Sequence, residues 1–231
     1  MTPIHVPEKL PGENGRQYAY RVLFDAIMTL EFPSGMLLVD AELSQALHIS
    51  RTPIREAIVS LTESKLVDVH PQKSSSVSRI DLDAVEEGVF LRFHTERAIL
   101  REAVRKADGS AFALLHKNLE AQREAVESCD PDRFIELDNA FHRLLYFSVN
   151  KPWTWATVTR IVTHQDCVRR LQTRLSGEGA KASYTDHQAI FNMLMTREDK
   201  DIDEFLYNHL TAGYRAALPE LIKKYPTYFA L

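Results

Sequence analysis

The chain has 231 residues, of which 45% are apolar, so it can bury a substantial core in one or two domains. Its formal net charge of −4 argues weakly against a protein that binds nucleic acid over its whole surface. No apolar run approaches the roughly 20 residues of a membrane span, and the N-terminus lacks the features of a secretory signal, so we expect a cytoplasmic protein without membrane contact. Cys129 and Cys167 are too few and too far apart for a disulfide framework or a cysteine zinc site.

The N-terminal part is predicted to be a flexible arm followed by a first helix. Residues 1–15 contain three prolines and two glycines with few apolar side chains, which is typical of an irregular segment. Apolar residues then recur at helical spacing, at Tyr20, Leu23, Phe24, Ile27 and Leu30. Residues 32–35, which include a proline and a glycine, end this helix.

The next two helices carry the most informative residues of the chain, Ser50-Arg51-Thr52-Pro53-Ile54-Arg55-Glu56-Ala57. A second helix begins near Asp40, which can cap it, and ends in a turn at residues 48–49. With Ser50 as cap, a third helix is predicted over residues 53–64. Arg51 and Arg55 are four residues apart, which puts both guanidinium groups on the face that a helix-turn-helix presents to DNA.

A wing is expected after the third helix. Residues 66–70 and 77–80 alternate in polarity and predict two short strands around a polar loop at residues 71–76. Three helices and this hairpin make a winged helix. Residues 16–79 contain seven basic and seven acidic side chains, so this segment is less repulsive to DNA than the rest of the chain, which carries the negative balance.

The remainder of the chain is predicted to be an all-helical bundle. Helical periodicity marks helices at residues 82–106, 110–128, 131–149, 152–173, 183–196 and 201–223, with a break in the last near Pro219. The longest loop is expected at residues 176–180. The fold class is therefore mainly α, with an arm at residues 1–15, a winged helix-turn-helix at 16–79 and a helical domain at 80–231.

Histidines and one aspartate form a second group of candidate functional residues. Asp138 and His142 are four apart on one amphipathic helix, so their side chains project from one face and can converge on one ion. His187 and His209 belong to other helices. A lone buried histidine is more often a hydrogen-bonded core residue than a metal ligand, so the pattern carries the inference rather than any single residue.

Residues 16–79 resemble the winged-helix domain of GntR-type transcription regulators, in which the stretch standing here at residues 50–58 is central. The resemblance implies that the third helix enters the major groove of double-stranded operator DNA, with Ser50, Arg51, Thr52 and Arg55 at the interface. The implied wing contacts are His70 and Lys73. A solvated ion pair of the arginines with Glu56 and its neighbours, and a merely solvated wing, are the alternatives.

The helical part resembles the FCD effector domain of the same family. The matching motifs are residues 138–142, 148–150 and 186–190, with His209 22 positions after His187. The resemblance implies that Asp138, His142, His187 and His209 hold a divalent ion. Imidazole and carboxylate ligands do not select sharply among metals, so zinc, nickel and a manganese-like ion are all expected candidates.

The resemblance also implies an effector and a dimer. A small carboxylate metabolite would complete the coordination of the ion near Arg92 and Glu96, and His164 could line the same site. An ordinary helix ion pair is the alternative for Arg92 and Glu96. Two copies are expected to bind twofold half-sites as a homodimer. Most such regulators are repressors that their effector releases.

Two other classes of protein remain as alternatives. A metal-dependent enzyme acting on a small organic acid is the main one, because histidines around an open metal ion can activate water. The sequence has none of the usual catalytic motifs, such as His-Glu-x-x-His or Gly-x-Ser-x-Gly, so we do not predict an enzyme. The other alternative is a metal-dependent interaction module that does not bind DNA, but it does not explain the helix-turn-helix.

Overall fold

The computed structural model describes residues 6–70, 75–198 and 200–230, and the chain divides into two compact units. The first unit reaches to Val85 and includes the C-terminal segment from Tyr225, and the second unit is Glu86–Lys224. The division falls inside helix α4 (Leu82–Lys106), six residues after the boundary predicted from the sequence. None of the described helices is long and apolar enough to cross a membrane.

Helix α1 (Gly15–Met28) begins five residues before Tyr20, the first of its periodic apolar residues, and its first turn is capped. The Asn14 side chain accepts a hydrogen bond from the Gln17 backbone, and the Gln17 side chain accepts one from the Asn14 backbone. The expected arm is tied to this helix over its described part. Tyr18 donates a hydrogen bond to the Pro7 carbonyl, and Arg21 pairs with Glu13.

Helices α2 (Asp40–Leu47) and α3 (Arg51–Glu63) form the helix-turn-helix, although both start differently from the prediction. Asp40 is the first helical residue of α2 rather than its cap. Helix α3 begins at Arg51, because a proline is tolerated anywhere in a first turn whose N–H groups have no helical partner. Ser50 occupies the cap position but makes no side-chain capping bond.

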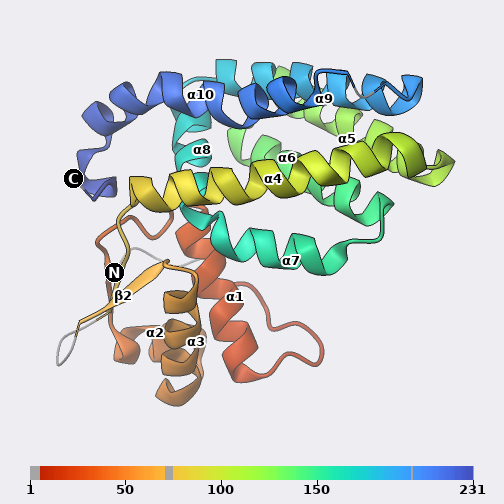
Figure 1. Cartoon of the computed structure of the whole chain (residues 1–231). Coiled ribbons are helices and arrows are strands. Elements are labelled where there is room, and N and C mark those ends of the chain that lie inside the picture. The colour runs from red at the N-terminus through yellow and green to blue at the C-terminus, as the bar shows by residue number, and fades with distance from the viewer. Residues whose placement is uncertain (1–5, 71–74, 199, 231) are drawn as a thin grey trace. The chain divides into compact units, whose positions relative to one another are not determined.

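The predicted hairpin is a three-stranded antiparallel sheet (Figure 1). Its strands are β1 (Leu37–Leu38), β2 (Val67–Val69) and β3 (Ser75–Val77), in the order β1-β3-β2. Strand β1 was not predicted, because two residues are too few to show an alternating pattern. The first unit also holds the 3-10 helix η1 (Pro226–Tyr228), and Ile80 bridges to Phe229 next to it.

The second unit is all-helical in its described residues (Figure 1). After α4 come α5 (Gly109–Glu127), α6 (Pro131–Ser148), α7 (Pro152–Ile161), α8 (Thr163–Leu175), α9 (Glu178–Thr196) and α10 (Ile202–Lys224). Helix α6 contacts α5, α8 and α9, and α8 also contacts α9 and α10. These five helices surround the candidate site.

Three details of the helical prediction were wrong. The single helix expected over residues 152–173 is two helices that part at Val162 and take different directions in Figure 1. Helix α9 begins at Glu178, so most of the predicted loop is helical despite its glycines. Pro219 lies inside α10, which continues to Lys224. Local composition suggested a loop through Gly179 and a break at Pro219, but both residues are helical, since tertiary packing overrides weak local preferences.

Candidate metal centre and DNA-binding surface

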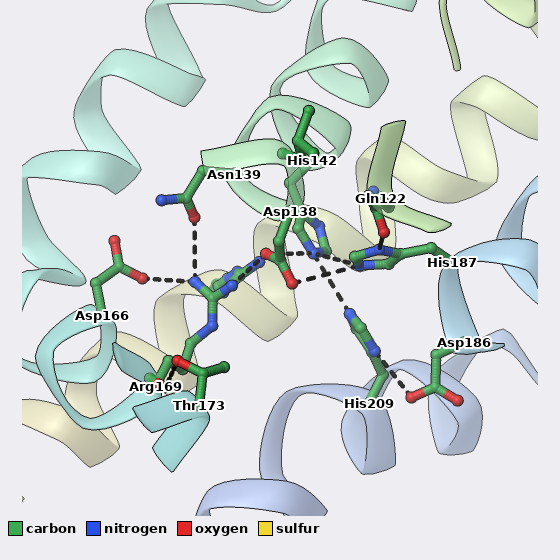
Figure 2. Close-up of polar contacts among 12 residues, drawn as sticks. Gln122, Asp138, Asn139, His142, Asp166, Arg169, Thr173, Asp186, His187 and His209 are labelled. Carbon is green, nitrogen blue, oxygen red and sulfur yellow. Dashed lines mark hydrogen bonds and ion pairs between the residues drawn. The ribbon is translucent and has the colours of Figure 1, made fainter. Parts of the chain in front are cut away.

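Helices α6, α9 and α10 bring the predicted ligands together (Figure 2). His142 Nε2 lies 3.3 Å from His187 Nε2 and 3.3 Å from His209 Nε2. The nearest oxygens of Asp138 lie 3.8 Å from His142 Nε2 and 3.7 Å from His187 Nε2. His142 and His187 are fully buried, and Asp138 is nearly so. The three histidines therefore form one compact cluster, and the carboxylate of Asp138 lies beside two of them.

The other ring nitrogen of each histidine faces a side-chain oxygen. His187 Nδ1 lies 2.8 Å from Gln122 Oε1, His209 Nδ1 lies 3.0 Å from Asp186 Oδ2, and His142 Nδ1 lies 2.8 Å from Glu96 Oε2. An acceptor at Nδ1 places the proton of a neutral imidazole there, which leaves Nε2 with its lone pair. Three lone pairs are thus directed at the same space.

A chain of hydrogen bonds fixes the proton of His187. The Leu137 carbonyl can only accept, so Asn118 must turn its Nδ2 toward it, at 3.0 Å. Asn118 Oδ1 must then accept, and Gln122 Nε2 donates to it at 2.7 Å. Gln122 is left with its oxygen facing His187, which has to donate from Nδ1. A backbone carbonyl thereby determines that Nε2 of His187 is free to bind an ion.

These residues fit a divalent metal ion. Ligand nitrogens about 2.0–2.1 Å from a tetrahedral zinc lie about 3.3–3.4 Å apart, which matches the observed Nε2 separations. Three facing lone pairs repel one another unless a cation or a proton lies between them. Burial also lowers the pKa values of His142 and His187, which keeps these imidazoles in the neutral form that binds metal.

Asp138 has a second partner that the sequence did not suggest. Its carboxylate pairs with Arg169 of α8, which also bonds Asp166 at 2.7 Å and Asn139 at 3.1 Å (Figure 2). Burial alone would raise the pKa of Asp138, but the attraction of Arg169 and of the histidines outweighs it and holds the pKa far below its usual range. Asp138 is therefore an anion that an ion and a guanidinium could share.

Arg92 and Glu96 form a buried ion pair on α4, with 2.6 Å between Arg92 Nε and Glu96 Oε1. The second oxygen of Glu96 faces His142, so both oxygens of this carboxylate are engaged within the protein. Burial would raise the pKa of Glu96, but Arg92 and His142 lower it well below its normal value. The structure thus puts Glu96 beside a histidine as a supporting group rather than in contact with the cavity.

A cavity of about 120 Å³ opens next to the histidines. Its lining includes Arg92, Asp138, His142 and His209, together with Gln165 and Arg169 of α8. Small residues of α9 and α10 form another part of the wall, among them Gly179, Ala182, Ala212 and Gly213. His164, which the sequence suggested as an effector contact, is buried but does not line this cavity. Its neighbour Gln165 does.

The predicted DNA-contacting residues of α3 lie at the surface of the first unit. Ser50, Arg51, Thr52 and Arg55 are all exposed. Arg55 pairs with Asp40, at 2.6 Å from Nε to Oδ2, and not with Glu56. This contact uses Nε and leaves both terminal nitrogens of an exposed side chain available for a base or phosphate.

The wing contributes one described candidate. His70 is exposed, and its Nε2 lies 3.3 Å from Ser76 Oγ. Lys73, the other predicted contact, lies outside the described residues. Of the two predicted wing contacts, the described residues therefore place His70 alone, at the surface.

Two family models match the chain over the same two parts. Residues 16–77 match the bacterial regulatory proteins of the gntR family, and residues 89–212 match the FCD domain. The chain belongs to the GntR family and carries an FCD domain. The family identifies it as a DNA-binding transcription regulator rather than an enzyme, as the resemblance predicted.

Relatives of this GntR/FCD protein are regulators too. It is 30% identical over 200 residues to the HTH-type transcriptional repressor RspR of Escherichia coli K12, with 87% of each chain covered. It is 31% identical over 216 residues to an uncharacterized HTH-type transcriptional regulator of Streptomyces ambofaciens, with 91% of this chain and 90% of that chain covered. The solved structure of E. coli McbR/YncC is similar in fold, with a TM-score of 0.74 at 18% identity over 92% of this chain and 99% of that one.

Several residues of the site were missed in the sequence. Asn118 and Gln122 lie in the buried apolar stripe of α5 with Leu115, Leu119 and Ala125, and polar residues at those positions are the signal that could have revealed them. Arg169 and Gln165 give no comparable signal. Their role depends on the direction that α8 takes after Val162, which the periodicity did not predict.

Proposed function

We propose that this GntR/FCD protein is a cytoplasmic repressor whose affinity for operator DNA is controlled by a small carboxylate bound at a metal centre in its helical unit. The observation that carries the proposal is the convergence of three histidine Nε2 atoms whose Nδ1 atoms each face an oxygen. Such an arrangement is costly in a protein core unless a cation uses the lone pairs.

In this proposal Asp138, His142, His187 and His209 hold the ion, which is zinc, nickel or a manganese-like metal. When bound, the ion acts as a Lewis acid that accepts a carboxylate oxygen of the effector. Arg92 lies 3% exposed in the cavity wall and can pair with the same carboxylate. The cavity would thus combine two groups that both attract an organic anion.

The DNA-binding part of the proposal rests on α3. Arg51 and Arg55 are one turn apart and exposed, so they can reach the major groove together, while Thr52 and Ser50 can bond the backbone at the start of the helix. His70, with Lys73 beyond the described residues, would contact DNA from the wing. We propose a homodimer, because one recognition helix covers only a few base pairs and paired half-sites supply the remaining affinity.

The effector acts only through its different affinity for two arrangements of the protein. We propose that the protein represses transcription and that the effector relieves this repression. The name of its relative RspR, a transcriptional repressor, supports this direction of control. A regulator of this kind loses operator affinity when both ion and acid are present and keeps it when either is missing.

The experiment that tests this function compares His187→Ala with His116→Ala. His116 is an exposed histidine of α5 and serves as the control. We expect the His187 variant to lose bound metal and the response of operator binding to small organic acids, measured by metal analysis and by electrophoretic shift with the DNA upstream of its own gene. A His187 variant with a full complement of metal, or a wild-type protein that does not bind that DNA, contradicts the proposal.

A further inference from the structure

We propose, on the basis of the function proposed above, that the effector is a small monocarboxylic acid with a hydroxyl group, and that Gln165 is the residue that recognises the hydroxyl. Gln165 lies on α8, is 1% exposed and lines the cavity beside the histidines. Neither its amide oxygen nor its amide nitrogen has a hydrogen-bond partner. A buried amide in this state has lost its water without compensation.

The other buried amides of the site show what a purely structural residue looks like. Gln122 bonds His187 through its oxygen and Asn118 through its nitrogen. Asn118 likewise uses both ends of its amide. Gln165 alone among these three is directed into the cavity with both ends free. Folding does not account for a glutamine there, whereas a ligand that pairs with it does.

An amide requires a partner that both donates and accepts. A simple carboxylate has only acceptor oxygens, so it can satisfy Nε2 but leaves Oε1 unpaired. A hydroxyl group donates to Oε1, and either the hydroxyl or a carboxylate oxygen accepts from Nε2. Rotation of the amide exchanges the two atoms without changing this requirement, so the conclusion does not depend on which end is oxygen.

The size of the cavity limits the acid to a short chain. A volume of about 120 Å³ is somewhat smaller than the roughly 150 Å³ of a cavity that holds one benzene molecule, which suits an acid of about three or four carbon atoms. Longer polyhydroxy acids would have to extend past the wall that Gly213 and its small neighbours form. Lactate and glycerate are therefore suitable probes.

The charges at the site favour one carboxylate over several. Two guanidinium groups are present, and four carboxylates lie against them or against the histidines: Arg92 and Arg169, with Glu96, Asp138, Asp166 and Asp186. Two positive guanidinium groups, four negative carboxylates and one divalent ion have a net charge of zero. A bound monocarboxylate then adds one negative charge to the site, and a dicarboxylate adds two. Uncompensated charge in a mostly buried site is unfavourable.

The test is calorimetric titration of the zinc-loaded full-length chain with D- and L-lactate, glycerate, propionate and alanine. We expect at least one hydroxy acid to bind more than about tenfold more tightly than propionate, because a site that pairs a hydroxyl rejects the analogue without it. In Gln165→Met, which keeps the side-chain volume but not the amide, this ratio should fall to within about threefold. Gln188→Met makes the same change at an exposed position of α9 and should keep the ratio.

A second measurement separates recognition from a structural role. The zinc-loaded, acid-free Gln165→Met protein should melt at or above the temperature of wild type, because the substitution removes an unpaired buried amide. A lower melting temperature together with an unchanged ratio between lactate and propionate would show that Gln165 is structural.

The outcomes distinguish this proposal from the function on which it depends. Equal binding of propionate and the hydroxy acids, or preferential binding of alanine, overturns the hydroxyl assignment while the acid-responsive regulator stands. If Gln165→Met still binds a hydroxy acid more than about tenfold more tightly than propionate, Gln165 is not the residue that recognises the hydroxyl. Zinc-loaded protein that binds no acid at all overturns both.

Discussion

Replacement of Gln122 by methionine should weaken metal binding although Gln122 is not a ligand. The substitution keeps a long side chain in the core but removes the amide between His187 and Asn118. His187 would then be free to carry its proton on Nε2, where it competes with the ion. Partners of this kind typically change metal affinity by about 10–100-fold, which is about 1.4–2.8 kcal/mol.

The same change should also reduce stability by a calculable amount. Two buried polar groups lose their partners, His187 Nδ1 and Asn118 Oδ1, and both residues are at most 8% exposed. An unpaired buried group costs about 1–3 kcal/mol, so the unfolding free energy of the metal-free protein should fall by about 2–6 kcal/mol.

Zinc affinity can be measured by competition with a chromophoric chelator, and stability by denaturant unfolding of the metal-free protein. Gln188→Met is the matched control, because its amide bonds Tyr184 at the surface and should affect neither quantity. A Gln122→Met protein that is destabilised as expected but binds zinc within about twofold of wild type would refute the role of the hydrogen-bond chain in setting the histidine proton.

Three other perturbations test separate parts of the molecule. Arg55→Ala should weaken specific operator binding by about 1–3 kcal/mol in a fluorescence titration without lowering the melting temperature, and undiminished affinity would exclude a groove contact. Because burial lowers the pKa values of His142 and His187 from 6.5, the unfolded state binds more protons below that pH, and the metal-free protein should melt at progressively lower temperature as the pH falls below about 6.5. Burial raises the pKa of Cys167 to about 12, so a thiol reagent at pH 8 should label the exposed Cys129 alone in the native protein and both cysteines after unfolding, which mass spectrometry would show.

The two-part organisation was predictable because its signals are local. The sequence around Ser50, Arg51 and Arg55 predicts the helix-turn-helix, and the predicted start of α3 is within one helical turn of the observed one. Apolar periodicity predicted the bounds of α4 as they are observed. The break at Val162 was not predictable, since both sides keep helical periodicity and helical hydrogen bonds run up to and away from that residue. The break is decided by the packing of α8 against α6 and α10, which no local pattern records.

The residues of the candidate metal site were predicted and most of their partners were not, for a related reason. Asp138 and His142 share a helix face, so their spacing alone indicates that they act together. The partner of His187 lies 65 residues away on another helix, and the partner of Asp138 lies 31 residues away. Amides and arginines occur at many positions without a special role, so only the folded arrangement distinguishes Gln122 and Arg169 from the others.

Helix α8 connects the two halves of the proposed control mechanism within the helical unit. Arg169 and Gln165 are four residues apart and therefore lie on one face of α8, and both line the cavity. An ion that binds Asp138 shares this carboxylate with Arg169 of α8, while an acid that pairs with Gln165 contacts the same helix one turn earlier. Ion and acid thus act on the same helix, and two ligands that favour the same position of one element must increase each other's affinity by equal factors. Zinc affinity should consequently rise with the concentration of the acid, to the same extent that acid affinity rises with zinc.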